Sequence, residues 1–297
     1  ATGNVGSVVL ALLRAANIPA RGAVRPEPST SQAHVAETDS ATVAFDFLDS
    51  STWDLAFEGI ELVFLVRPAA LSNVPRDIVP AMEAAKHAGV KHIVFLSLQG
   101  AESNSVVPHA KIEKWLRTSG LSWTFLRPSY FMQNLSTTHV AEIRDHSQIV
   151  IPAGKGRTAL VDVNDIAAVA VEVLAHPEAH LDRSWTPTGP NAITYNEVAE
   201  ILSAELGRPI RYTRPGLGQY AKHARRDLAM PWAMVLVTSA IYTVARLGRA
   251  AGLTDDVRTV TGRPPTTFAE FAHRERDAWI PSPFCWIPTR MPHVHRS

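Results

Sequence analysis

Short apolar runs alternate with helix-like segments along roughly the first 130 residues of the chain. The runs are rich in β-branched and aromatic residues, which suit a strand that is buried on both faces. Strands that alternate with helices form a parallel sheet that helices cover on both sides. The pattern therefore predicts an α/β fold, a doubly wound parallel sheet. Its strands are expected at residues 20–25, 42–48, 62–66, 92–98 and 122–129.

The helix-like segments end at glycines, and the pattern changes after about residue 130. Segments 79–88 and 107–119 each stop at a glycine, the residue type that commonly follows a last helical turn. Segments 165–174 and 196–206 still read as amphipathic helices, but the strands between them are short. We therefore expect a sheet domain over 1–150, a smaller lobe over 151–280 that is partly interleaved with it, and an irregular tail over 281–297.

The composition describes a folded protein with little net charge. Of 297 residues, 46% are hydrophobic and 19% are charged, which excludes a disordered chain. Lys and Arg number 29 against 28 Asp and Glu, so a net charge of +1 offers no field for nucleic acid. Cys285 is the only cysteine, and His293 and His295 lack acidic neighbours, so we expect no disulfide and no metal site. No basic-then-apolar leader opens the chain, and we expect a cytoplasmic protein.

One uncharged stretch has nearly the length of a membrane span. Residues 229–245 carry no charge, and 17 residues is the lower limit for crossing a bilayer. The stretch contains Pro231 and three serine or threonine side chains, and Arg246 follows at once. We favour a helix buried in the smaller lobe and expect no membrane association.

The chain begins with a glycine pair at the start of an apolar helical stretch. Gly3 and Gly6 have the spacing of a dinucleotide-binding turn, in which backbone N–H groups at a helix N-terminus face the pyrophosphate. The alternative is a simple loop before a helix. Such a turn normally follows a strand, whereas nothing precedes Ala1. Either the numbered chain lacks its first strand and first glycine, or the sheet is altered at its centre, and we favour the former.

The cofactor preference should depend on the residue about 20 positions beyond this turn. An acidic residue there binds the ribose 2′-hydroxyl, whereas an arginine accommodates a 2′-phosphate. Arg25 stands at the end of the first predicted strand and favours NADP over NAD. Arg21 competes for the role, and the alternative for Arg25 is an exposed loop arginine.

Further motifs are distributed along nearly the whole chain, in segments 1–6, 24–26, 46–49, 59–66, 126–134, 161–167, 188–190, 255–257 and 261–268. Taken together they resemble the NmrA-like family, a family of atypical short-chain dehydrogenases, and the resemblance extends from residue 1 to about residue 279. The resemblance implies a Rossmann-type fold with a domain that binds NADP(H) and a small carboxy-terminal lobe that closes over the nicotinamide.

The resemblance also implies which residues contact the cofactor. Gly3, Asn4, Val5 and Gly6 would hold the pyrophosphate, and Arg25 the 2′-phosphate. Asp46 and Phe47 would edge the adenine. The residues around the nicotinamide and its ribose would be Val66, Arg67, Ser97, Leu98, His109, Pro128, Ser129, Tyr130 and Phe131.

The catalytic pair departs from that of typical short-chain dehydrogenases, which use Tyr-x-x-x-Lys. Aligning the chain with them puts Ser105 at the tyrosine position and His109 at the lysine position, and no tyrosine precedes Tyr130. His109 is a candidate proton source or substrate contact, because an imidazole can do both near neutral pH. The alternative is a histidine in the first turn of a helix that binds ribose or water. Tyr130 is the best other proton donor.

The missing tyrosine suits an acceptor that needs little acid assistance. We expect an NADPH-dependent reductase that passes hydride to a small hydrophobic acceptor such as a quinone, an enone, an imine or iminium, or a conjugated cation. The alternative is a non-catalytic NADP-sensing regulator that acts through a protein partner. The apolar segment 230–247 favours the enzyme, since a hydrophobic lid suits such a substrate, and a homodimer is a candidate assembly. The expected substrate contacts are Phe131, Met132, Asn134, Met230, Trp232 and Met234.

Overall fold

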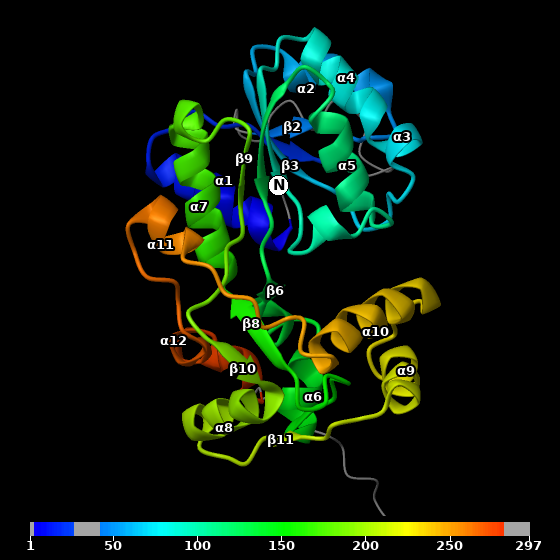
Figure 1. Cartoon of the computed structure of the whole chain (residues 1–297), viewed down its shortest axis with the longest axis vertical. Helices are drawn as coiled ribbons and strands as arrows, with labels where there is room; N and C mark the ends of the chain where they lie inside the picture. The colour runs from blue at the N-terminus through cyan, green and yellow to red at the C-terminus, as the bar shows by residue number, and fades with distance from the viewer. Residues whose placement is uncertain (1–2, 27–41, 282–297) are drawn as a thin grey trace, which may run out of the picture.

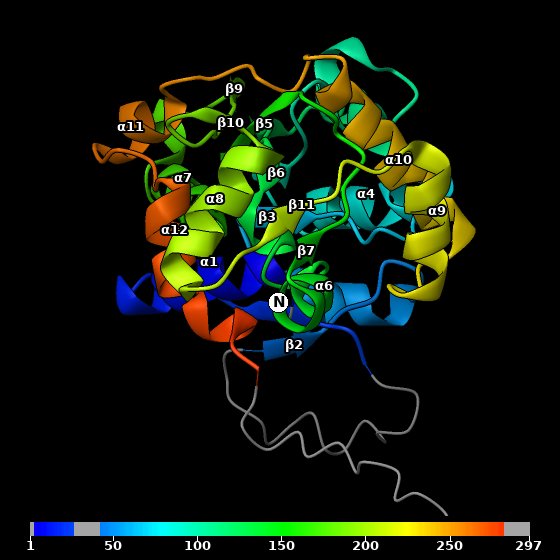
Figure 2. The same cartoon turned by 90° about the horizontal axis from the view of Figure 1, so that it is seen from below.

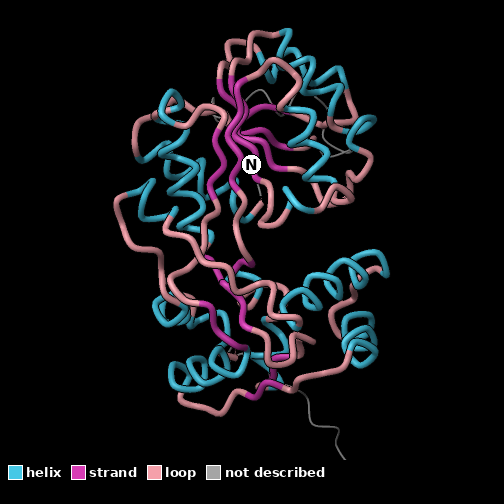
Figure 3. Tube along the Cα trace, in the orientation of Figure 1, coloured by secondary structure: helices cyan, strands magenta, loops and turns pink. Residues whose placement is uncertain are grey.

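The computed structural model of the chain describes residues 3–26 and 42–281, so the predicted tail lies outside the described residues except for Pro281. Figure 1 shows two parts, one above the other along the longest axis of the molecule. The upper part contains parallel strands between helices, and the lower part is a smaller lobe of helices with short strands. Figure 3 shows the strands of the upper part converging into one sheet-like layer.

The strands of the upper part are all parallel, which confirms the predicted Rossmann-type α/β fold. Four of them form a sheet in the order β3-β4-β5-β9, and β1 pairs with β2 in a separate ladder. Several strands are shorter than predicted. The strand expected at 122–129 ends before Pro128, which lacks the N–H that would continue the ladder, and the strand expected at 42–48 ends before the turn at Asp46. The bounds are β1 (Gly22–Val24), β2 (Thr42–Ala44), β3 (Leu62–Val66), β4 (His92–Leu96), β5 (Ser122–Leu126) and β9 (Arg183–Trp185).

Helices cover both faces of this sheet. β4 is buried throughout, and its side chains alternate between two cores: Val94 and Leu96 face one, and Ile93 and Phe95 the other. The first core lies under α1 (Asn4–Ala15), α7 (Val163–Ala175) and α11 (Asp256–Thr261). The second lies under α2 (Trp53–Phe57), α3 (Val74–Asp77), α4 (Val79–His87) and α5 (Pro108–Leu116).

The short strands of the lower lobe begin near residue 130, where the sequence pattern changes. β6 (Tyr130–Phe131) pairs with β8 (Arg157–Val161), and the domain bounds at residues 150 and 280 stay a prediction. The chain then returns to the upper part as α7 and β9, because these bury against the sheet. The other elements of the lobe are α6 (Val140–His146), β7 (Gln148–Ile149), β10 (Ala192–Thr194), α8 (Tyr195–Leu206), β11 (Arg211–Tyr212), α9 (Leu217–Arg226), α10 (Trp232–Arg246) and α12 (Phe268–Arg274). Short 3-10 helices are η2 (Ser50–Thr52), η3 (Ala101–Ser103), η4 (Met132–Asn134), η5 (Pro177–Ala179) and η6 (Arg276–Trp279).

The uncharged stretch 229–245 forms α10, which lies beside α9 at one side of the molecule (Figure 2). Its expected burial is wrong: only Val235, Tyr242 and Ala245 are buried, whereas Leu236 is 69% exposed. Only the inner face of α10 packs against the lobe, and the opposite face, which is also apolar, is exposed to solvent. Within the described ranges, none of the helices has both the length and the apolar character that a membrane span requires.

The backbone of α10 approaches the turn at Gly156 very closely. A Cβ atom on Gly156 would lie 1.8 Å from the Ala245 carbonyl oxygen, which is backbone and cannot rotate away. Gly156 therefore allows the end of α10 to pack against the turn that precedes β8.

Gly156→Ala should destabilise the protein by about 1–3 kcal/mol, because the clash has to push α10 away from the turn. Gly218→Ala in α9 is the matched control, since its Cβ would meet nothing within 4 Å. Urea unfolding of both variants measures the difference. Equal stability of the two variants would contradict the close packing at Gly156.

Candidate functional site

The N-terminus of α1 has the geometry of an anion-binding site. The helix begins at Asn4, and Gly3 precedes it in an extended conformation with no side-chain cap. The first N–H groups of a helix lack intrahelical partners and carry the positive end of its dipole. A Cβ on Gly3 would meet nothing within 4 Å, so open space lies before the helix, while Val5 is buried in the core below. The backbone from Asn4 to Gly6 can therefore face a phosphate group.

The structure separates the two arginines that competed for the 2′-phosphate. Arg21 donates from one terminal nitrogen to the carbonyl oxygens of Leu55 (2.9 Å) and Glu58 (3.5 Å), which ties it to α2. Arg25 is exposed and donates from Nε to Asp46 Oδ2 at 2.7 Å. Both arginines are exposed, and they differ in their partners: Arg21 is bonded to backbone carbonyls of α2 and its C-cap, whereas Arg25 is bonded through Nε to Asp46.

Asp46 holds that orientation from the turn after β2. Burial alone would raise the pKa of Asp46, but the hydrogen bonds from Arg25 and from the Leu48 N–H outweigh it and lower the pKa. The carboxylate stays ionised at neutral pH and keeps its pairing with Arg25. The neighbouring Phe47 packs edge-on against Phe45, with ring centroids 4.9 Å apart.

Three buried polar atoms without a protein partner lie in segments that follow the carboxyl ends of adjacent strands. They are Arg67 Nε after β3, His109 Nδ1 in the first turn of α5 after β4, and Ser129 Oγ after β5. Buried polar groups are normally hydrogen-bonded, so three unpaired polar groups beyond the carboxyl ends of neighbouring strands favour a polar ligand there. This end of the sheet is called the sheet edge below. All three belong to the predicted cofactor contacts, and this donor set fits a dinucleotide.

The remaining predicted contacts at this edge differ in their exposure. Val66 ends β3 and is 40% exposed, and Leu98 is half-buried. Ser97 is buried and donates to Glu113 Oε1 at 2.7 Å, so its side chain is engaged within the protein. The Pro128 carbonyl accepts from the Gln99 N–H at 3.0 Å, which joins the segments after β4 and β5.

Glu113 is a residue of the site that the sequence analysis missed. It lies on α5 one helical turn after His109, is 1% exposed, and accepts two hydrogen bonds from Arg127 at 2.9 and 2.6 Å. Arg117 adds a third contact at 3.3 Å. A charged residue on the apolar face of a helix, between Ile112 and Leu116, is the signal that points to it.

His109 is an uncharged imidazole in this structure. Burial, followed by the positive charge of Arg67, lowers its pKa to about 4, although Glu113 acts in the opposite sense. The ring stacks on Phe95 with centroids 5.9 Å apart. The lowered pKa favours the neutral imidazole at neutral pH, and the role of His109 as a proton source stays a prediction. It can still donate a hydrogen bond.

Tyr130 begins the lower lobe directly after the sheet edge. Its hydroxyl shares a hydrogen bond of 2.6 Å with the hydroxyl of Tyr242 on α10. Burial raises the pKa of Tyr130, so the phenol keeps its proton at neutral pH. The following Phe131 packs against the core under α1 and α7, and the Asn134 carbonyl accepts from the His139 N–H.

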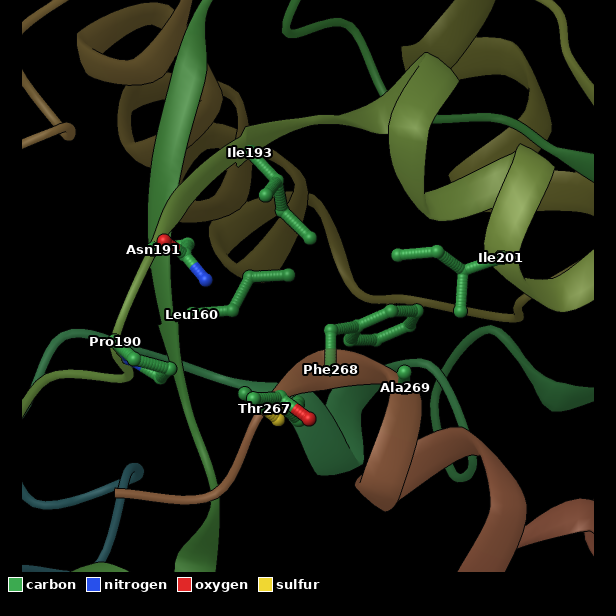
Figure 4. Close-up of a pocket in the computed structure, with 9 residues that line it drawn as sticks. Leu160, Pro190, Asn191, Ile193, Ile201, Thr267, Phe268 and Ala269 are labelled. Carbon is green, nitrogen blue, oxygen red and sulfur yellow. The ribbon is translucent and has the colours of Figure 1, made fainter. Parts of the chain in front are cut away.

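The predicted substrate contacts spread over two places. Met132 lines a cavity of about 160 Å³, whose walls in Figure 4 include Leu160, Ile193, Ile201 and Phe268. Met230, Trp232 and Met234 do not line that cavity. Met230 packs against the core of the lower lobe, Met234 is half-buried, and Trp232 is 61% exposed beneath the Arg225 guanidinium. The substrate assignment of these residues stays a prediction.

Comparison with known proteins places the chain in a family. The model described as the NmrA-like family matches residues 1–247. This chain belongs to the NmrA-like family. It is 37% identical to an "NAD(P)H azoreductase" of Xenophilus azovorans over 91% of this chain and 94% of the relative. It is 32% identical to a "Prestalk A differentiation protein A" of Dictyostelium discoideum over 91% of this chain and 89% of the relative.

A solved structure supports the same fold. The NADPH-dependent quinone oxidoreductase QOR2 of Escherichia coli, complexed with NADPH, has 24% identity and a TM-score of 0.79, covering 92% of this chain and 96% of that chain. The predicted family and fold are confirmed. The name of the azoreductase relative states NAD(P)H as its reductant, which supports the predicted NADP(H) cofactor and the predicted oxidoreductase class.

Arg25→Ala should weaken NADPH binding by roughly tenfold and leave NADH binding nearly unchanged, because a charge-assisted hydrogen bond to the 2′-phosphate is lost. Titration calorimetry with each cofactor measures both affinities. Arg21→Ala is the matched control and should not alter the ratio between them. If Arg25→Ala weakens the binding of NADPH and NADH equally, the assignment of Arg25 to the 2′-phosphate is wrong.

The pKa of His109 predicts a loss of stability in acid. The folded pKa of about 4 lies below the ordinary value of 6.5, so the unfolded chain binds more protons as the pH falls from about 6.5 to 4. His109→Gln should therefore recover up to about 2 kcal/mol of unfolding free energy at pH 5 relative to pH 7. Urea unfolding at both pH values measures it, with the exposed His176→Gln as control. The same pH dependence in all three proteins would contradict a neutral His109.

Proposed function

We propose that this chain reduces small conjugated acceptors, such as an azo compound, a quinone or an iminium, with NADPH as the reductant. The observation that carries the proposal is the chemistry of the sheet edge. It offers hydrogen-bond donors at Arg67, His109 and Ser129, but His109 is neutral and the Glu113 carboxylate is fully paired. Such a site suits an acceptor that takes up hydride readily and needs no strong acid.

The chain's own residues would divide the work of binding and proton transfer. Gly3 to Gly6 would hold the pyrophosphate and Arg25 the 2′-phosphate. Arg67, His109 and Ser129 would hydrogen-bond the nicotinamide half of the cofactor. Bound NADPH supplies the hydride. The phenol of Tyr130 would then give its proton to the atom of a neutral acceptor that gains negative charge, whereas a cationic acceptor is neutralised by hydride alone.

Two features support this choice of acceptor. The azoreductase relative covers nearly the whole chain at 37% identity, and an azo compound is a conjugated acceptor. The second feature is α10, which exposes apolar side chains at Leu236, Val237 and Ile241 while its Tyr242 reaches Tyr130. An apolar helix that contacts the proton donor suits a flat hydrophobic acceptor.

Tyr130→Phe should lower kcat on a neutral azo or quinone acceptor by about 10²-fold and change the rate on a triarylmethane cation little, because only the neutral acceptor needs a proton. His109→Ala is the comparison variant and should slow both acceptors alike, as expected for lost positioning of the cofactor. NADPH oxidation with both acceptors gives the four rates.

Other results would redirect the assignment. Equal loss on both acceptors in Tyr130→Phe would make Tyr130 a structural residue. Tight NADPH binding without reduction of any acceptor by the wild type would favour the cofactor-sensing alternative.

A further inference from the structure

A continuous chain of hydrogen bonds leads from Tyr130 through the lower lobe to its surface. It joins side chains of β6, α10, the residue before α6, α6 itself, α9 and the C-cap of α9, which are far apart in the sequence. Every link is 3.0 Å or shorter. The links are Tyr130 Oη–Tyr242 Oη (2.6 Å), Tyr242 Oη–His139 Nε2 (2.9 Å), His139 Nδ1–Glu142 Oε1 (3.0 Å), Glu142 Oε2–His223 Nε2 (2.5 Å) and His223 Nδ1–Asp227 Oδ2 (2.7 Å).

The middle of this chain is shielded from water and its far end is not. The side chains of His139 and Glu142 are 0% and 2% exposed, while that of Asp227 is 64% exposed. Burying a carboxylate is costly unless it is paired and hydrogen-bonded. Glu142 meets this need with both imidazoles and with the Val150 N–H at 2.9 Å. The fold therefore places a negative charge in the interior and surrounds it with groups that hold protons.

The geometry fixes the direction of the bonds around Glu142. A carboxylate only accepts, so His139 Nδ1 and His223 Nε2 each carry a proton toward it. Burial would raise the pKa of Glu142, but the hydrogen bonds from its partners hold it below the usual range, and the carboxylate stays ionised. With Nδ1 fixed as a donor, His139 can hold or release a proton only at Nε2, the atom that faces Tyr242.

We propose that His139, through Tyr242, supplies the proton that Tyr130 gives to the reduced acceptor. This inference rests on the proposed function. Tyr130 Oη–H transfers its proton to the acceptor anion, Tyr242 Oη–H transfers its proton to Tyr130 Oη, and His139 Nε2–H transfers its proton to Tyr242 Oη. Three O–H or N–H bonds break and three form, His139 changes from imidazolium to imidazole, and no electrons move. After the product leaves, a water molecule in the place of the acceptor gives a proton to Tyr130, and the same transfers in reverse, through Tyr242, return it to His139 Nε2.

Glu142 and His223 are positioning residues in this account. The Glu142 carboxylate stabilises the imidazolium of His139, and His223 links that carboxylate to Asp227. Tyr195 of α8 and Tyr220 of α9 also face the tyrosine pair, and Tyr220 packs edge-on against Tyr242 with centroids 5.4 Å apart. Tyr220 donates to Thr238 Oγ1 at 2.8 Å and is not a link of the chain.

The deciding variant is Tyr242→Phe, which removes the middle hydroxyl and keeps the ring. Tyr220→Phe is its matched control, because it removes a neighbouring hydroxyl bonded to the same helix without cutting the chain. The kcat ratio between a neutral azo acceptor and a triarylmethane cation should fall about tenfold or more in Tyr242→Phe, at the lower end of acid–base effects. It should stay at the wild-type value in Tyr220→Phe. An unchanged ratio in Tyr242→Phe would overturn the proposal.

The pH profile separates proton supply from a structural role. In the wild type, the rate on the azo acceptor should fall as the pH rises, because the proton supply is lost, and the rate on the cation should not. Tyr242→Phe should remove this pH dependence, whereas Tyr220→Phe should keep it. A structural role would lower both rates at every pH, and that result would contradict the proposal.

Histidine ¹⁵N NMR of the protein without cofactor gives a readout that is independent of turnover. One imidazole should change its titration in Tyr242→Phe and not in Tyr220→Phe, and the same signal should be missing in His139→Gln. Identical histidine titrations in the wild type and Tyr242→Phe would show that the tyrosine is not coupled to His139. If the wild type reduces no acceptor, the proposed function fails, and this measurement still decides whether the linked protons exist.

Discussion

The buried carboxylate of Glu113 holds the sheet edge together, and the rest of the site depends on it. An unpaired carboxylate in the interior would be strongly unfavourable, so the fold has to bring cations and donors to it. Arg127 comes from the end of β5, Ser97 from the end of β4, and Glu113 itself from α5. Their mutual bonds fix these three elements relative to one another. Because His109 lies one turn before Glu113 on α5, its place at the edge is fixed as well.

The lower lobe follows a similar rule around a second buried carboxylate. Glu142 orders α6, α9 and α10 through its two histidines and Tyr242, and this order leaves one face of α10 inward and the other outward. A third carboxylate, Asp162, joins the lobes: it caps α7, accepts from Gln133, and pairs with Arg274 of α12 at 2.7 Å. Buried negative charges thus organise both halves of the molecule, although the chain as a whole is nearly neutral.

The sequence predicts the sheet well because strands buried on both faces are continuous apolar runs. The residues of β3 were predicted to the exact bounds, whereas β2 and β5 end earlier at features of local turn chemistry. The two-residue strand β6 was not predicted as a separate strand, because it is held by pairing with β8, about 30 residues further on. The outward face of α10 was also missed, since composition does not say which side of an apolar helix finds a partner.

In the candidate site, too, features set by the local sequence could be predicted, and features set by contacts between distant segments could not. Arg25 could be proposed from its position after a strand, because cofactor recognition there depends on local order in the chain. The neutral state of His109 could not, because it follows from Phe95 and Arg67, which the fold brings to it. Likewise, Tyr242 and His139 are 103 residues apart, and only the folded structure shows that they share a hydrogen bond.

The central claim is that the protein transfers hydride from NADPH to a conjugated acceptor. Turnover of the full-length chain with NADPH deuterated at the hydride-donating carbon, and a triarylmethane cation as acceptor, tests this claim most directly. The account predicts one deuterium on the central carbon of each reduced product molecule, and reduced product without the label, or no reduction while NADPH stays bound, would contradict it.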